Sequence, residues 1–243
     1  MPFREEVGLL SASDLLEPLS EGEIEELARR NPDTRLDEGE VFFKPEEGLE
    51  RLYVLKEGRV RVYKTDARGQ EVTLEVVRAG SAFGEMALTA QRLRDTYAVA
   101  EEPSVVFSLR REELESLIRR NGEVGFRLVR SLSERLRRCQ TRLEDVTLKE
   151  VPARLASQIL ELIEAEGVAS EGGYRVPTRY THEQLASMIG ANRVSVSKAF
   201  AELRERGIVR SEGRHILVED LDALGRAAQA ESRARRIAES ERR

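Results

Sequence analysis

Residues 181–208 read THEQLASMIGANRVSVSKAFAELRERGI and contain two short helical patterns separated by Gly190. Thr181 precedes the first pattern and Asn192 precedes the second, and both residue types are favourable N-caps. Gly190 can supply the turn between the two helices. This arrangement predicts a helix-turn-helix. Its buried side chains are expected to be Leu185, Ala186, Ile189, Val196, Phe200 and Leu203.

Burial of this apolar set turns the polar start of the second helix outward. A DNA major groove admits one helix, which reads bases with side chains near its N-terminus. Arg193 is placed to donate two hydrogen bonds to a guanine, whereas Lys198 suits a phosphate. Residues 208–218 predict a β-hairpin wing; a helix pair used only for packing is the alternative. The candidate DNA-binding residues are Thr181, His182, Arg193, Val194, Ser195, Ser197, Lys198 and Arg214.

Charge is unevenly distributed along the chain. The 243 residues include 40 basic and 45 acidic side chains, for a net charge of −5, yet residues 175–215 carry eight basic and four acidic ones. A local basic patch in an acidic protein is typical of a surface that binds nucleic acid. Chance clustering on a solvated surface is the alternative that charge alone leaves open.

The N-terminal half changes from a helical to an alternating pattern. Residues 1–36 are expected to be helical, with a capping box from Ser20 and Glu23. Short runs then alternate apolar and polar residues, as half-buried strands do. Turn glycines at 39, 48, 58, 69 and 80 follow one another at 9 to 11 residues. This spacing predicts a compact antiparallel barrel or roll. The expected strands are 40–44, 51–55, 59–64, 71–77, 96–100 and 104–109.

A long helix is expected over residues 122–146. Its apolar positions alternate in steps of three and four residues, which is the heptad seam of a coiled coil. Both flanks of the seam are strongly charged, which favours pairing with a second copy over packing on the chain's own barrel. We therefore expect a parallel homodimer. The predicted dimer interface is Val129, Leu132, Leu136, Cys139, Leu143 and Val146.

These patterns indicate an α+β protein in which residues 1–120 form a β-roll sensor domain. Residues 121–148 form the dimerisation helix, and residues 149–225 form a winged helix-turn-helix domain. Residues 226–243 lack a clear apolar face, and we expect a frayed or disordered tail.

Composition excludes several classes of function. A single cysteine excludes an internal disulfide framework and a multi-cysteine iron–sulfur cluster, and two histidines leave little for a metal site. No apolar run approaches ~18 residues, and the N-terminus lacks a secretory pattern, so a cytoplasmic protein without a membrane segment is expected. No nucleophile triad, Walker loop or zinc-protease motif is found, so we do not expect an enzyme.

The order of β-roll, long helix and winged helix-turn-helix resembles the cyclic-AMP receptor protein/FNR family of bacterial transcription regulators. The family's nucleotide cassette is matched by Phe83-Gly84-Glu85-Met86 and by Arg94. The resemblance implies that Gly84, Glu85 and Arg94 hold a phosphate and that Glu85 takes a ribose hydroxyl. It further implies double-stranded DNA and RNA polymerase as partners, with no cofactor required.

Departures from the family pattern leave the effector open. Asp95 replaces the serine usual after the arginine, and Cys139 and Gln140 replace adjacent hydroxyl residues of the long helix. Arg135 matches the arginine with which the nitrogen-control branch binds 2-oxoglutarate. Cyclic AMP, 2-oxoglutarate, an effector-independent regulator and a nucleotide-binding module for a non-DNA partner therefore remain alternatives. The candidate effector residues are Phe83, Gly84, Glu85, Met86, Arg94, Asp95, Arg135, Cys139 and Gln140.

Overall fold

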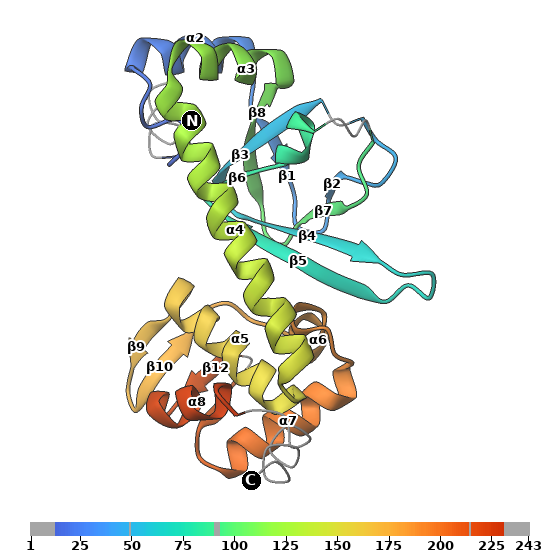
Figure 1. The fold of residues 1–243 in the computed structure, drawn as a ribbon. Coiled ribbons are helices and arrows are strands. Elements are labelled where there is room, and N and C mark those ends of the chain that lie inside the picture. Colours follow the sequence, from blue (N-terminus) through green and yellow to red (C-terminus); the bar gives the residue numbers. More distant parts are fainter. Residues whose placement is uncertain (1–12, 49, 90–92, 214, 231–243) are drawn as a thin grey trace, which may run out of the picture. The chain divides into compact units, whose positions relative to one another are not determined.

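The structure, a computed structural model, describes residues 13–48, 50–89, 93–213 and 215–230 (Figure 1). The chain divides into two compact units, Met1–Arg135 and Leu136–Arg243. Helix α4 (Gly122–Leu148) is continuous across the division. The predicted α+β class, with strands in both units and a long helix between the sequence halves, is confirmed.

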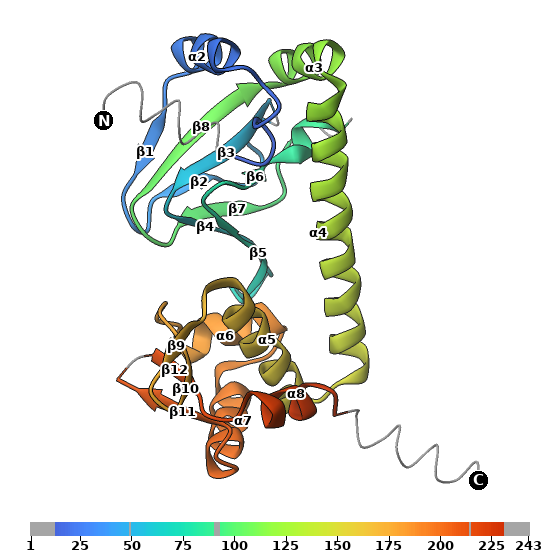
Figure 2. The same cartoon turned by 90° about the vertical axis from the view of Figure 1, so that its left-hand side faces the viewer.

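The first unit contains two four-stranded antiparallel sheets, whose strands are labelled in Figure 2. One sheet has the order β1-β8-β3-β6 and the other has the order β2-β7-β4-β5. The expected strands are all present, with their ends moved by one or two residues. The strand bounds are β1 Thr34–Leu36, β2 Val41–Phe43, β3 Arg51–Glu57, β4 Arg59–Thr65, β5 Glu71–Arg78, β6 Ala82–Phe83, β7 Tyr97–Ala100 and β8 Ser104–Arg110.

Two apolar clusters hold this unit together. The first joins the inner faces of both sheets and includes Phe43, Leu55, Val60, Phe83 and Val106. The second packs the sheet of β3 and β8 against helices α2 (Glu21–Arg30), α3 (Arg111–Arg120) and the start of α4, and its members include Leu16, Ile24, Leu109, Leu114 and Val124. Burial of these side chains is the main favourable term in folding.

The expected helical stretch at the N-terminus is partly wrong. Ser20 and Glu23 form the predicted capping box at the start of α2. Helix α2 ends at Arg30, and Thr34–Leu36 is strand β1, which pairs with β8. Pro32 explains the break, because the residue before a proline disfavours the helical region. Residues 1–12 lie outside the described part of the chain.

The predicted long helix is confirmed and ends two residues later than expected, at Leu148. Near its start, Val124 and Leu128 are buried in the first unit. The predicted seam is exposed, with Leu136 61% and Leu143 69% accessible. No described helix is both long enough and apolar enough to cross a membrane.

Beyond α4, the second unit contains helices α5 and α8, the helix-turn-helix and a small sheet of order β11-β12-β10-β9. The predicted start of a frayed tail at residue 226 is wrong. Helix α8 continues to Ala228, and Ala227 and Ala228 are buried. Residues 231–243 lie outside the described part. The element bounds are α5 Val151–Glu166, β9 Val168–Ser170, β10 Gly173–Val176, α6 His182–Ile189, α7 Arg193–Glu205, β11 Val209–Glu212, β12 His215–Val218 and α8 Leu221–Ala228.

Candidate functional site

Helices α6 and α7 begin at the two predicted caps. The Thr181 hydroxyl accepts a hydrogen bond from the Gln184 backbone N–H at 3.1 Å, and Gln184 Oε1 accepts one from the Thr181 backbone N–H at 2.9 Å. Asn192 Oδ1 accepts from the Ser195 backbone N–H at 2.8 Å. Gly190 is the C-cap of α6 in a left-handed conformation. The caps fix where each helix starts, and therefore which side chains lie at the N-terminus of α7.

Helix α7 has one buried and one exposed face. Val196, Ala199, Phe200 and Leu203 are buried. Arg193, Val194 and Lys198 are exposed, and Val194 is 63% accessible. An exposed large apolar side chain next to an exposed arginine, at the N-terminus of a helix, is the arrangement that can meet base edges in a major groove.

Three of the polar candidates make contacts within the motif. The Thr181 hydroxyl is part of the α6 cap. Ser197 Oγ lies 2.8 Å from Nδ1 of His182, and the His182 ring lies 5.3 Å from the ring of Phe200. This contact joins the start of α6 to α7 and fixes the two helices against each other. Sequence spacing did not indicate it, because the two residues are far apart on separate helices.

Arg154 of α5 anchors the turn of the motif. Its Nη1 donates to the Ile189 carbonyl at 2.9 Å, at the end of α6. Burial lowers the pKa of this guanidinium, and the charge of Asp145 raises it. Nothing in the sequence pattern indicates this role, since its partner, the Ile189 carbonyl, belongs to a helix 35 residues away.

The predicted wing is a two-stranded hairpin. Strands β11 and β12 pair from Val209–Val218 to Glu212–His215. Arg210 of β11 forms an ion pair with Glu219, in which Nε lies 2.8 Å from Oε1. Arg214, the predicted phosphate contact, lies outside the described residues.

The cassette of the first unit starts at Gly84, which precedes the short 3-10 helix η1 (Glu85–Leu88). Gly84 has φ of +82°, and a Cβ there would lie 2.8 Å from Cδ2 of Tyr53 and 3.2 Å from the Arg51 carbonyl oxygen. A side chain at this position would therefore be strained and would clash. Phe83 is buried in the core, and Met86 is 40% exposed.

Arg94 is buried against aromatic rings. Its guanidinium carbon lies 3.8 Å from the centroid of the Phe43 ring and 5.3 Å from that of Tyr53. Its Nη2 donates to the Tyr53 hydroxyl at 3.3 Å and to the Arg51 carbonyl at 3.4 Å. Burial lowers the pKa of Arg94, and Tyr53 opposes that shift. The predicted phosphate-binding cation thus makes cation–π contacts inside the roll.

Arg135 is paired with two carboxylates. Its Nη2 lies 2.9 Å from Oε2 of Glu75, and its Nη1 contacts Oε2 of Glu85. Nη2 also donates to the Ala82 carbonyl at 3.1 Å. Burial acts to lower the pKa of Arg135, but the charges of Glu75 and Glu85 outweigh it and raise the pKa. Nothing in the sequence pattern singles out Glu75, because it belongs to the polar set of an alternating strand.

The remaining predicted effector residues lie apart from this pair. Asp95 forms an ion pair with Lys64 at 2.7 Å, which removes an uncompensated carboxylate next to Arg94. Cys139 and Gln140 are exposed residues of α4 and belong to the second unit. The structure therefore brings together Glu85 and Arg135, while Arg94 and Asp95 each bind other partners.

A further arginine fixes the end of the cassette. Arg111, the first residue of α3, donates through Nη2 to the Thr89 carbonyl at 2.6 Å and through Nε to the Ala87 carbonyl. These are the carbonyls at the C-terminal end of η1, which lack partners within so short a helix. The described part of the chain holds no group of three or more His, Cys, Asp or Glu side chains arranged for a metal ion.

Comparisons with known proteins place both units in recognised families. Residues 33–121 match the cyclic nucleotide-binding domain, and residues 153–227 match the Crp-like helix-turn-helix domain. A CRP-like cAMP-activated global transcriptional regulator of Mycobacterium tuberculosis is 30% identical over 220 residues, which cover 90% of this chain and 98% of that protein.

Two further relatives agree with this result. A global nitrogen regulator of Synechocystis sp. is 27% identical over 190 residues, which cover 77% of this chain and 84% of that protein. The crystal structure of a CRP-family transcriptional regulator from Thermus thermophilus aligns with a TM-score of 0.69 at 31% identity. That alignment covers 81% of this chain and 97% of the other.

Proposed function

The chain belongs to the CRP/FNR family of transcription regulators, and from this premise we propose that it acts as a homodimer that binds a near-palindromic DNA site. The predicted family resemblance and the order of β-roll, long helix and helix-turn-helix are confirmed. The family provides the general function, regulation of transcription through a helix-turn-helix. The proposal adds the assembly, the contacts with DNA and the state of the effector cassette.

The observation that carries the DNA proposal is the exposed N-terminal face of α7. Arg193, Val194 and Lys198 are exposed there, while the opposite face fills the core of the motif. Arg193 donates two hydrogen bonds to guanine, Val194 packs against a thymine methyl group, and Lys198 contacts a phosphate. Ser195 and the wing supply further contacts with the DNA backbone. Thr181, His182 and Ser197 hold the recognition helix in place.

The dimer proposal rests on the seam of α4. Val129, Leu136, Leu143 and Val146 are more than half exposed in the single chain, although they recur at coiled-coil spacing. An apolar stripe of this kind is stabilised by a second helix with the same stripe. Two-fold symmetry then presents the two recognition helices one DNA turn apart, at ~34 Å. RNA polymerase is proposed as a partner through the family alone.

The contacts of the cassette favour a regulator that needs neither cyclic AMP nor 2-oxoglutarate to bind DNA. Arg135, the cation expected to bind 2-oxoglutarate, already forms ion pairs with Glu75 and Glu85. Glu85, the expected ribose ligand, is held by the same arginine. Arg94, the expected phosphate ligand, donates to Tyr53 and lies on the Phe43 ring. An anionic effector must therefore break protein contacts before it gains its own.

Selection of binding sites from a random duplex library tests the DNA proposal. The full chain should enrich a near-palindromic sequence without any added effector. Cyclic AMP or 2-oxoglutarate at millimolar concentration should leave the affinity for that sequence unchanged. Enrichment only in the presence of one effector would reject the effector-independent reading. The absence of any enriched sequence would favour a nucleotide-binding module that acts on a partner other than DNA.

A further inference from the structure

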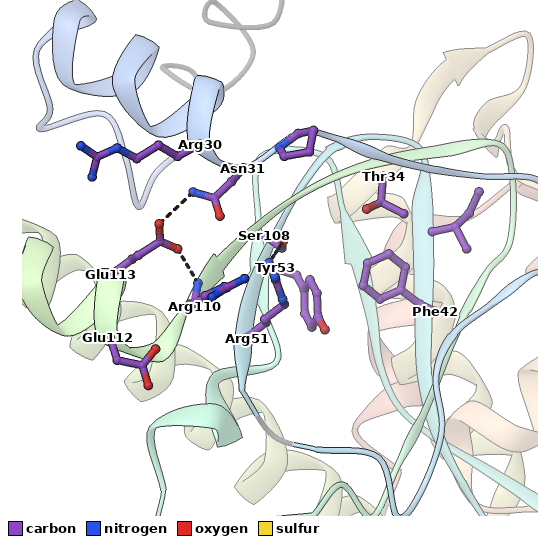
Figure 3. Close-up of a pocket in the computed structure, with 12 residues that line it drawn as sticks. Arg30, Asn31, Thr34, Phe42, Arg51, Tyr53, Ser108, Arg110, Glu112 and Glu113 are labelled. Carbon is purple, nitrogen blue, oxygen red and sulfur yellow. Dashed lines mark hydrogen bonds between the residues drawn. The ribbon is translucent and has the colours of Figure 1, made fainter.

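A cavity opens in the first unit, and no residue of η1 lines it. It has a volume of about 730 Å³ and is lined by the end of α2, by strands β1, β2, β3 and β8, and by the start of α3 (Figure 3). This volume falls within the range of ~300–1,000 Å³ that is usual for small-molecule sites. Neither Arg135 nor Glu85 lines it.

Aromatic rings form one wall of the cavity. Phe42 and Tyr53 lie with their ring centroids 4.7 Å apart and their planes at 90°. Leu36 of β1 adds aliphatic surface to the lining. A flat ring placed against two rings in this edge-to-face arrangement gains both burial and aromatic contact.

Arg51 of the lining is placed to bind an anion. Arg51 shares a face of β3 with Tyr53, and its Nη1 donates to Ser108 Oγ at 2.8 Å (Figure 3). This hydrogen bond orients the guanidinium, yet no carboxylate of the described chain pairs with it. Its other N–H groups can therefore take a ligand carboxylate in a bidentate pair.

The other charges of the lining are mostly engaged. Glu113 accepts from Asn31 Nδ2 at 3.2 Å and from the Arg110 backbone N–H at 3.0 Å. Arg30 pairs with Glu26 of its own helix. No ion pair links the guanidinium of Arg110 or the carboxylate of Glu112 to another described side chain, and the opposite charges of these two lining residues offset one another. The lining therefore matches a ligand with a single anionic group.

We propose that this cavity binds a small planar aromatic acid with one negative charge. The ring lies against Phe42 and Tyr53, and the carboxylate is held by Arg51. The site shares no lining residue with the cassette and does not depend on the proposed DNA contacts. Tyr53 links the two places, because its hydroxyl accepts the hydrogen bond from Arg94.

Calorimetric titration of the full chain with 2-naphthoate tests the proposal. The wild type should bind the probe, and Arg51→Gln should weaken binding at least tenfold, because the bidentate pair is lost. Arg35→Gln is the matched control, since Arg35 lies on β1 between the lining residues Thr34 and Leu36 but is not part of the lining. This control should bind as the wild type does. The neutral analogue 2-naphthalenemethanol should bind at least tenfold more weakly than 2-naphthoate.

A cavity-filling variant keeps the test decisive if Arg51→Gln does not fold. Thr34 is exposed at the lining, so Thr34→Trp should fold and block the site. Equal 2-naphthoate binding by wild type and Thr34→Trp would overturn the proposal. Absence of binding at millimolar probe would do the same. Loss of binding in Arg94→Ala but not in Arg51→Gln would place the probe in the cassette and also overturn it.

Discussion

Arg135 and Glu75 form an ion pair of 2.9 Å between helix α4 and strand β5. The side chains are each only 20% exposed, and Glu85 contacts the same guanidinium. Two carboxylates thus surround one cation at the place where the family resemblance implies an anionic effector. Glu75 supplies the negative charge that such an effector would otherwise bring.

Glu75→Gln should open this site to an anion. The variant keeps the size of the side chain but leaves Arg135 with one carboxylate, so 2-oxoglutarate should raise the melting temperature of the variant and not of the wild type. Without ligand, the variant should be less stable by ~1–3 kcal/mol, because the amide of Gln is a weaker partner for the guanidinium than the carboxylate is. Thermal melts with and without 2-oxoglutarate measure both effects. The ligand concentration should be on the order of 10 mM, so that it exceeds even a weak Kd about tenfold.

Glu71→Gln is the control for this variant. Glu71 lies on the same strand but pairs with Arg61 at 2.7 Å, away from Arg135. The melting temperature of Glu71→Gln should not change when 2-oxoglutarate is added. A wild type that is stabilised by 2-oxoglutarate as strongly as Glu75→Gln would show that Glu75 does not close the site.

Leu136→Glu should convert the proposed dimer into monomers that bind DNA poorly. Leu136 is 61% exposed in the single chain and lies in the apolar seam. In a dimer the two introduced carboxylates, one from each chain, would face each other across that seam. Light scattering after gel filtration measures the mass. Thr141→Glu adds the same charge at an exposed position outside the seam and should remain dimeric. A wild type that elutes as a monomer at micromolar concentration would contradict the dimer.

The elements that could be predicted from sequence are those set by local rules. The capping box of Ser20 and the caps at Thr181 and Asn192 depend on residues three positions apart, and all three are present. Strand β1 was missed, because it has only three residues, of which Thr34 and Arg35 are exposed, and so shows no alternation. Its hydrogen bonds come from Val105 and its neighbours, far along the chain.

The same distinction explains the candidate site. The residues on the exposed face of α7 follow from helical periodicity, so Arg193, Val194 and Lys198 could be placed in advance. The environment of the cassette could not, because the contacts of Arg135 with Glu75 and of Arg94 with Phe43 join distant strands and helices. A motif gives the identity of such a cation but not the partner that it binds in the fold.

Gly58→Ala should destabilise the first unit. Gly58 has φ of +88°, and an added Cβ would lie 2.3 Å from Ser104 Oγ and 2.5 Å from the Pro103 carbonyl oxygen. The backbone atoms cannot move away without disturbing strands β4 and β8, so the loss should exceed ~1 kcal/mol in free energy of unfolding. Urea denaturation measures it. Gly69→Ala is the control for the clash: Gly69 has φ of +79° with open space around it, so it should lose less.

Arg193→Ala should lose ~1–3 kcal/mol of binding free energy and relax the preference for one guanine in each half-site. Lys198→Ala should instead weaken all sequences about equally and reduce the salt dependence of binding, because its partner is a phosphate. Fluorescence anisotropy with the selected site and with single-base variants, at several salt concentrations, separates the two effects. Equal losses of base preference in both variants would contradict the assigned roles.

Val194 should determine the neighbouring base pair. Its side chain is 63% exposed and cannot accept a hydrogen bond from a cytosine amino group, but it can pack on a thymine methyl group. The selected half-site should therefore differ from the TGTGA type of the cyclic-AMP receptor protein and resemble that of the nitrogen-control branch. Replacing the contacted thymine with uracil removes only the methyl group and should weaken the wild type but not Val194→Ala. Recovery of a TGTGA-type consensus, with discrimination unchanged in Val194→Ala, would show that Val194 does not read this base pair.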